Sequence, residues 1–546
     1  MIGRGVVPPV LHDEERREEM GVPADPTVPG RYMIELNIQY RGGLRAASIA
    51  FRGLYREVLG ETYAITHPPV EISKSYYQCL MSVEQWRKLL RKDEEQAATD
   101  PSRRVIYKLW PDFKVKALID RSVATVKADA AVRAYLATGA GITWAVIDSG
   151  IEGIHPHFGR VERALESTIH HPDVAELHYD FTLDRPIVEP PPGLDAAALV
   201  EFLEKSQQEH DARAHVEALR DGFGHGTHVA GIIAGRLPDG AAQLPLPGRA
   251  PVAGAAPPGD AVRYAAFEQV FEADPEGKRI FNGKVPVPRY VRRSDALHGV
   301  APECLLVSLK VLDQAGEGRV SDVMRALVYV REHLNDDPKM LRVHGVNLSI
   351  GYDFDAQMFA CGQSPLCVEV DRLVKSGVVV VTAAGNTGYG KINADQRSAK
   401  AGLSNTINDP GNAALAITVG STHRDSPHTF GVSYFSSKGP TGDGRLKPDL
   451  VAPGERITSC AAMAKRLQLG IELAGEVAAY IDDSGTSMAA PHVSGAIAAF
   501  LSIRREFIQR PEEVKRIFLD SATSLGRERY FEGHGLVDLM RAIQSV

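Results

Sequence analysis

In the stretch DSGTSMAAPHVSG (residues 483–495), Ser487 is surrounded by small residues. Small residues let two backbones, or a backbone and a ligand, approach closely. A serine at the start of a helix also lies where free N–H groups favour negative charge. Ser487 is therefore a candidate nucleophile for acyl transfer, if the chain supplies a base and donors for an oxyanion. The alternative is a tightly packed helix start that Ser487 caps.

Two other motifs offer a base and a carboxylate to orient it. AVIDSG ends an apolar stretch at Asp148, and DGFGHGTHVAGIIAG places His225 among glycines before an apolar run. Asp148 could instead cap the following turn. His225 and His228 lie three residues apart, on one helical face, and could share a metal ion. Because no glutamate lies between them and no third ligand is evident, a core role is favoured for His228.

An oxyanion donor is offered by VVVVTAAGNTG, in which Asn386 follows an apolar stretch and a glycine. An asparagine at this place could be a turn former. It could also aim its side-chain amide at the charge that develops during acyl transfer.

The elements that must position these residues are almost wholly apolar stretches that alternate with helical patterns. Such alternation predicts an α/β fold, a parallel sheet covered by helices on both faces, with its sites at the carboxyl ends of strands. The predicted strands are residues 142–148, 304–312, 343–350, 378–385 and 414–421, and the clearest helical patterns are 320–334 and 367–377.

A smaller domain is predicted before this sheet. After a charged, proline-rich tail (1–24), residues 25–115 follow the order β-α-β-β-α-β, which is typical of a small ferredoxin-like α+β domain. The remainder, 116–546, contains two stretches, about 159–220 and about 237–295, with too little periodicity for a core. We expect both to be surface insertions.

The composition narrows the class of protein. Lys and Arg total 62 against 69 Asp and Glu, a net charge of -7, which argues against nucleic-acid binding through phosphate contacts. No apolar run approaches the roughly 20 residues that span a bilayer, and the first residues do not resemble a secretory signal. Five cysteines indicate no disulfide scaffold, and free thiols are favoured for the pair in CGQSPLC. We expect a cytoplasmic protein with no membrane partner.

Residues from about Val123 to Val546 resemble the subtilisin-like serine peptidases, the subtilases. The matching blocks, in order, are AVIDSGI, GHGTHVAGIIAG, LHGVAPECLLVSLKVLD, VNLSIG, VVVTAAGN, GRLKPDLVAPGERI and SGTSMAAPHVSGAIA. The resemblance implies a subtilisin-like fold and a serine endopeptidase that acts on proteins or peptides.

It also implies a role for each matching residue. Ser487 would be the nucleophile, His225 the general base, and Asp148 the group that orients and stabilises the imidazole. Asn386 would help to form the oxyanion hole. Two segments would bind the substrate backbone by strand addition: Ser349, Ile350 and Gly351, and Ala383, Ala384 and Gly385.

The order and position of the small domain resemble the inhibitor-like propeptide of secreted subtilases. The resemblance implies an intramolecular inhibitor, with a maturation junction at Pro111–Arg121. The chain departs from those relatives because it shows no signal peptide. We expect no required cofactor and no metal at the catalytic site; structural calcium is left open and is not predicted, because no run of acidic and carbonyl ligands is evident.

Two other functions remain open at this point. One is a peptide-binding protein on a degenerate protease scaffold, and the other is a metal-dependent hydrolase that uses the histidines of IHPHF, STIHHPDV and HGTH. For specificity, Asp353 and Asp355 follow the first expected substrate segment, and the family resemblance places Asp409 near the primary pocket. If these carboxylates line the pocket rim, Lys or Arg would be tolerated at P1. The favoured alternative is that they are solvated carboxylates of surface loops.

Overall fold

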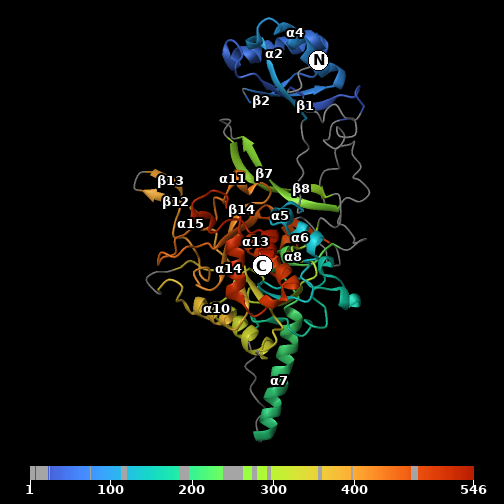
Figure 1. The fold of residues 1–546 in the computed structure, drawn as a ribbon. Helices are drawn as coiled ribbons and strands as arrows, with labels where there is room; N and C mark the ends of the chain where they lie inside the picture. Colours follow the sequence, from blue (N-terminus) through green and yellow to red (C-terminus); the bar gives the residue numbers. More distant parts are fainter. Residues whose placement is uncertain are drawn as a thin grey trace. The chain divides into compact units, whose positions relative to one another are not determined.

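The computed structural model describes residues 6–7, 23, 25–73, 75–111, 120–183, 196–237, 262–273, 279–291, 297–337, 339–354, 360–394, 397–468 and 478–546. The chain divides into two compact units, Met1–Lys116 and Ala117–Val546 (Figure 1). The predicted tail, 1–24, lies outside the described residues apart from 6–7 and 23.

The smaller unit has the predicted β-α-β-β-α-β order, with one short helix, α3, that the sequence did not predict. Its elements are β1 (Gly30–Leu36), α2 (Gly43–Leu59), α3 (Glu61–Thr66), β2 (Val70–Ser73), β3 (Tyr76–Met81), α4 (Val83–Gln96) and β4 (Ile106–Pro111). The sheet order is β2-β3-β1-β4, and every neighbouring pair is antiparallel. The ferredoxin-like prediction is thereby confirmed.

Helix packing and capping explain why this unit is stable. Tyr32 of β1, Phe51 of α2 and Trp86 of α4 are buried in one core. Helix α4 begins at a capping box, in which the Ser82 side chain accepts from Gln85 N and Ser82 N donates to Gln85 Oε1. The box pairs two backbone donors that would otherwise be unsatisfied at the helix start.

The larger unit is built on seven parallel strands in the order β15-β14-β11-β10-β5-β9-β6. They are β5 (Thr143–Asp148), β6 (Tyr179–Asp180), β9 (Leu305–Lys310), β10 (Gly345–Leu348), β11 (Val379–Ala383), β14 (Ile417–His423) and β15 (Leu450–Glu455). All five stretches predicted as strands belong to this sheet, so the α/β prediction is confirmed.

Helices cover both faces of the sheet, because consecutive side chains of a strand point to opposite faces. Trp144 and Val146 of β5 pack in the core that contains α8 and α13, whereas Ala145 and Ile147 pack in the core that contains α9 and α10. The α-helices of this unit are α5 (Asp120–Thr125), α6 (Ala128–Tyr135), α7 (Ala196–Glu217), α8 (His225–Ile233), α9 (Val320–Tyr329), α10 (Pro365–Lys375), α11 (Pro427–Phe430), α12 (Met463–Gln468), α13 (Thr486–Ile503), α14 (Pro511–Ser521), α15 (Arg529–Glu532) and α16 (Leu539–Gln544).

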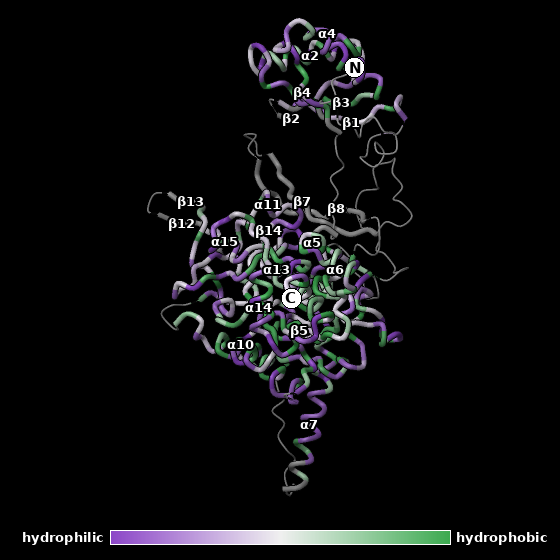
Figure 2. Tube along the Cα trace, viewed as in Figure 1, coloured by the Kyte–Doolittle hydropathy of each residue, from purple (hydrophilic) through white to green (hydrophobic). Residues whose placement is uncertain are grey.

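Helix α13 is the central helix of the larger unit (Figure 1). Among the described residues it alone is long and apolar enough to cross a membrane, but most of it is buried inside the fold. Hydrophobic positions, green in Figure 2, gather around α13 and along β5. Its apolar character therefore serves the packing of the core.

The first predicted insertion, 159–220, is not a surface excursion throughout. Ile169 and Leu177 are buried in the cores, and β6 forms an edge strand of the main sheet beside β9. A strand of two residues is too short to show a period, which is why the sequence pattern missed it. The end of the segment forms α7.

Part of the second predicted insertion, 237–295, extends a separate sheet. β7 (Val262–Ala273) and β8 (Arg279–Val291) form an antiparallel hairpin. They join β16 (Ile457–Cys460) and β17 (Tyr480–Asp483) in the order β16-β17-β7-β8. A further hairpin consists of β12 (Tyr389–Ala394) and β13 (Arg397–Gly402). Residues 238–261, 274–278 and 292–296 lie outside the described part of the chain.

Candidate active site

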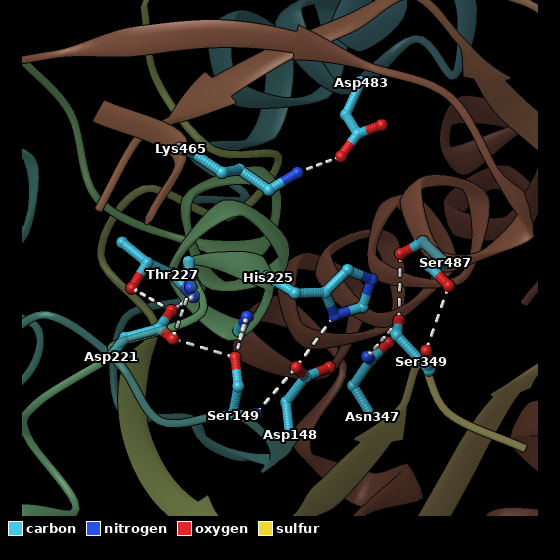
Figure 3. A network of polar contacts seen from close by, with 12 residues as sticks. Asp148, Ser149, Asp221, His225, Thr227, Asn347, Ser349, Lys465, Asp483 and Ser487 are labelled. Atoms are coloured by element: carbon cyan, nitrogen blue, oxygen red, sulfur yellow. Dashed lines mark hydrogen bonds and ion pairs between the residues drawn. The ribbon is translucent and has the colours of Figure 1, made fainter. Parts of the chain in front are cut away.

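A carboxylate and an imidazole meet at the carboxyl end of β5. Asp148 is the last residue of that strand, and its side chain is 1% exposed. His225 is the first residue of α8, and its Nδ1 lies 2.8 Å from Asp148 Oδ1. Figure 3 shows the His225 ring between Asp148 and Ser487. Since the carboxylate accepts at Nδ1, the Nε2 atom is the one left to exchange a proton with a substrate or a nucleophile.

A buried aspartate connects the two loops that carry this pair. Asp221 accepts hydrogen bonds from Ser149 Oγ (2.9 Å), from Gly224 N (2.7 Å), and from the N and Oγ1 atoms of Thr227 (2.8 and 2.6 Å). Ser149 Oγ in turn accepts from Gly226 N, at 2.9 Å. Asp221 therefore fixes the start of α8 against the residue that follows Asp148.

The environment of His225 changes its pKa in two opposing ways. Burial lowers the pKa, whereas the charge of Asp148 and the hydrogen bond to it raise the pKa. The two effects of Asp148 together outweigh the effect of burial, so the pKa of His225 is raised above its ordinary value. The protonated imidazole is thus favoured here, as a group that must accept a proton during the reaction requires.

The predicted nucleophile lies in the first turn of α13 and is tied to the end of β10. Ser487 Oγ donates to the Ser349 carbonyl (2.9 Å), and Ser349 Oγ donates to the Ser487 carbonyl (2.9 Å). Asn347 Nδ2 supports this pair by donating to Ser349 Oγ at 2.8 Å. The Ser487 hydroxyl therefore lies at the edge of the site and donates a hydrogen bond to a backbone carbonyl.

Asn386 follows β11 and is held by the residue before Ser487. Its Oδ1 accepts from Thr486 N at 2.9 Å and from Thr486 Oγ1 at 3.1 Å. Gly385 has φ +107°, a left-handed conformation that favours glycine and turns the chain at this point. Because its oxygen is already engaged, the amide presents Nδ2 as its donor end.

These residues surround one cavity of about 390 Å³. The predicted site residues that line it are His225, Ser349, Ile350, Gly351, Ala383, Gly385, Asn386 and Ser487. Asp148 is not among the lining residues and contacts the cavity only through His225. Ala384 does not line the cavity; it is fully buried, and its N–H donates to the Val419 carbonyl.

Several residues that line the cavity were not singled out from the sequence. They are Phe223, Leu312, Gly316, Thr387, Asn408 and Thr486. Most of them come from loops whose course no local pattern predicts. Thr387 and Thr486 are adjacent to predicted site residues, which is a signal that could have identified them.

Two of the three carboxylates that could form an acidic rim do not line the cavity. Asp409 is fully buried, and its Oδ1 accepts from Asn412 Nδ2 at 2.8 Å, so it does not lie at a rim. Asp353 is exposed but does not line the cavity, and Asp355 lies outside the described residues. Among the lining residues in the described part of the chain, His225 alone has an ionisable side chain that titrates near neutral pH.

The other histidines of these motifs bond to the backbone or to neighbouring side chains. His228 Nε2 lies 3.1 Å from the Ile481 carbonyl, and His155 Nε2 lies 2.9 Å from that of Ala479. His157 Nδ1 lies 3.0 Å from the Tyr480 hydroxyl, in the turn that follows β5. Burial lowers the pKa of each of these three histidines to about 3, so each is neutral near pH 7. All five cysteines are free.

Most of the larger unit is similar in sequence to one known family of proteins. Residues 139–536 match the sequence profile of the subtilase family. Pyrolysin of Pyrococcus furiosus is 29% identical over 406 residues, which are 67% of this chain and 25% of pyrolysin. Serine protease AprX of Bacillus subtilis is 31% identical over 233 residues, 41% of this chain and 48% of AprX. Subtilisin E of Bacillus subtilis is 30% identical over 246 residues, 45% of this chain and 51% of subtilisin E.

The match thus spans between a quarter and about half of the length of these relatives. Among solved structures, a cold adapted subtilisin-like serine proteinase matches 73% of this chain and 89% of its own, with 21% identity and a TM-score of 0.40. That similarity is too low to add to the family assignment.

Proposed function

Because this chain belongs to the subtilase family, we propose that it is a serine endopeptidase that hydrolyses peptide bonds in proteins or peptides through an acyl-enzyme. The observation that carries the proposal is the 2.8 Å contact between His225 Nδ1 and Asp148 Oδ1 at a cavity that Ser487 and Asn386 also line. A nucleophile, a base with its orienting carboxylate, and an oxyanion donor are the parts that acyl transfer requires.

In the first step, the Ser487 hydroxyl leaves the Ser349 carbonyl and turns to Nε2 of His225. Its oxygen attacks the scissile carbonyl carbon while the imidazole takes the proton. Asp148 stabilises the imidazolium. Catalytic hydrogen bonds are often loose in an empty site and tighten with substrate, so the resting contact with Ser349 is compatible with this step.

Asn386 Nδ2 and the backbone N–H of Ser487 would bind the oxyanion of the tetrahedral intermediate. His225 then passes its proton to the leaving amine, and the acyl group stays on Ser487. In the second step, water gives a proton to His225 and its oxygen attacks the ester carbonyl carbon. The resulting tetrahedral intermediate expels the Ser487 oxygen, which takes the proton back from His225, and the carboxylic acid leaves.

The substrate backbone would lie as an added strand between two wall segments. These are Ser349–Gly351 after β10 and Ala383–Gly385 at the end of β11. All of these residues except Ala384 line the cavity. Strand addition gives affinity through main-chain hydrogen bonds, with little dependence on the side chains of the substrate.

We further propose that the smaller unit inhibits the larger one before self-cleavage. The support is its β2-β3-β1-β4 antiparallel sheet, its resemblance to the inhibitor-like propeptide of secreted subtilases and its place immediately upstream. Most of the presumed junction, Pro111–Arg121, lies outside the described residues. A tethered inhibitor has a high effective concentration, so a modest intrinsic affinity suffices to block the site.

No cofactor is needed for this chemistry, and we propose that the enzyme works without one. Protein or peptide substrates and its own N-terminal unit are its proposed partners, with no role for nucleic acid or membrane. Five free cysteines fit a reducing compartment, and we propose the cytoplasm.

Casein hydrolysis by matched variants tests the proposed function. Ser487→Ala and His225→Ala should each reduce hydrolysis to a trace, because nucleophile and base act as a unit. Ser502→Ala, at the far end of the same helix and outside the polar network around Ser487, should retain activity as the control. Substantial hydrolysis by Ser487→Ala would show that another group does the chemistry.

A further inference from the structure

Exposed aromatic side chains begin two residues beyond the cavity wall. Thr387 lines the cavity, and Tyr389 starts β12 with 41% of its surface exposed. Tyr434, which is 68% exposed, meets it: the two ring centroids lie 5.5 Å apart at an interplanar angle of 85°. The edge of one ring thus faces the other, and both stay open to solvent.

Two more exposed aromatic residues, Tyr530 and Phe531 of α15, continue this surface. Lys438 Nζ lies 5.2 Å from the Phe531 ring centroid and 3.1 Å from the Tyr434 carbonyl. Gly439 N donates to the Tyr530 carbonyl at 2.9 Å. In Figure 1, α15 and the β12–β13 hairpin lie on the same side of the larger unit. We call Tyr389, Tyr434, Tyr530 and Phe531 the aromatic surface.

A buried lysine holds the backbone beneath the aromatic surface. Lys438 is 5% exposed, and its Nζ donates to the carbonyls of Gly388 (2.9 Å), Tyr434 (3.1 Å) and Ser436 (3.1 Å). Gly388 N also donates to the Phe435 carbonyl, at 2.9 Å. The segments that carry Tyr389 and Tyr434 are therefore tied together before any ligand arrives, which lowers the ordering cost of binding.

We propose that the aromatic surface binds an aromatic or large apolar side chain of the substrate, several residues away from the scissile bond. The proposal rests on the proposed endopeptidase function. Its support is the continuity of the chain from Thr387 in the cavity wall to Tyr389 on the surface. Large exposed apolar patches mark binding sites in soluble proteins, and rings that are not stacked face to face with one another can pack a further ring by edge or face.

Three peptide substrates with one common cleavage sequence test this proposal. One is short and reaches only the cavity, one is extended by six residues that include a tryptophan, and one has the same extension with serine in its place. The two extended peptides are made in an N-terminal and a C-terminal version. We expect the tryptophan to raise kcat/KM by roughly 3- to 10-fold over serine in one of the two versions.

The preference should disappear in Tyr389→Ser/Tyr434→Ser, while the short peptide is hydrolysed at the wild-type rate. Tyr135→Ser is the matched control, because Tyr135 of α6 is also 41% exposed and lies far from this surface in the sequence. It should keep the preference. All three tyrosines are exposed, and substitutions at exposed positions usually change the free energy of unfolding little.

The proposal is overturned if wild-type protein shows no preference for tryptophan in either version, or if the double variant keeps it. If the double variant instead turns a dimer into a monomer in light scattering and keeps the preference, the surface joins two copies and does not bind substrate. Failure of the proposed function would look different, since the short peptide would then not be hydrolysed by any form of the protein.

Discussion

His225 Nδ1 and Asp148 Oδ1 lie 2.8 Å apart, and the Asp148 side chain is almost entirely buried. This hydrogen bond joins two elements that are distant in sequence, the end of β5 and the start of α8. Hydrogen bonds of Ser149 and Asp221 fix the two loops that carry Asp148 and His225. The geometry gives the imidazole one tautomer and one direction for proton transfer.

The first prediction concerns pH. His225 can act as a base only when neutral, and its pKa is raised above the ordinary value of about 6.5. The logarithm of kcat/KM should therefore fall as the pH drops through the raised pKa, with the acid limb above pH 6.5. Asp148→Asn should move this limb to lower pH, because burial, which lowers the pKa, then acts without the opposing charge.

The same variant should lose about 10⁴-fold in kcat, the scale found for the corresponding change in a serine protease of another fold. Peptide hydrolysis followed between pH 5 and pH 9 measures both effects. An acid limb at the same pH in both proteins would show that the Asp148 carboxylate does not control the base.

The second prediction concerns Asn386. Its Nδ2 pairs with a charge that exists only in the transition state, so Asn386→Ala should lower kcat and leave KM nearly unchanged. The expected loss of about 10²–10³-fold is the value for the corresponding residue of a subtilisin and is taken from the family.

Asn386→Asp is the matched variant, because it keeps the oxygen that accepts from Thr486 and removes the donor. It should lose at least as much in kcat. A raised KM with wild-type kcat in both variants would assign Asn386 to substrate binding instead.

The third prediction concerns the residue at P1. The described residues that line the cavity include no carboxylate, and Asp409 is fully buried. An uncharged wall offers no partner for a desolvated ammonium or guanidinium group, which is costly to bury unpaired. A peptide library should therefore be cleaved after uncharged residues, with Lys and Arg depleted at P1. Enrichment of either cation at P1 would contradict this prediction.

The structure brings together candidate site residues that the sequence could single out, because each is adjacent to a strong local pattern. Asp148 ends an apolar strand, His225 opens a small-residue helix, and Asn386 follows a strand and a glycine. Each of these patterns is local, and the parallel sheet brings the strand ends to one edge. The sequence thus predicts that Ser487 and His225 lie close together, and both line the same cavity.

Other features of the site and the fold depend on contacts between residues far apart in sequence, which no local pattern contains. Asp221 orders the loop before His225 through partners up to 72 residues away in sequence, and its role was not predicted. β6 is too short to show a period, and it was placed in a surface insertion. Asp409 was placed at a rim because its position in the chain is close to the substrate segments, but the fold turns it into the interior.

The fourth prediction concerns the N-terminal unit. Wild-type chain should be cut once near Pro111–Arg121, whereas Ser487→Ala should remain full length. The isolated segment 1–115 should inhibit the mature fragment in trans, and more weakly when its C-terminal residues are removed. Mass spectrometry of the products and inhibition assays measure this. Equal activity of the full chain and of a well-folded chain beginning at Lys116, with no inhibition in trans, would leave a folding or docking role for this unit.

The most direct test of the central claim is the site at which a fluorophosphonate reacts. The full chain is treated with the probe before and after an incubation that permits self-cleavage, and the labelled peptide is identified by mass spectrometry, with a chelator present in a parallel sample. We predict one adduct, on Ser487, with the same yield in the chelator, and greatly slowed labelling of His225→Ala. Absence of an adduct on Ser487 in both samples, or loss of hydrolysis in the chelator alone, would contradict the assignment of a serine endopeptidase that works without a metal.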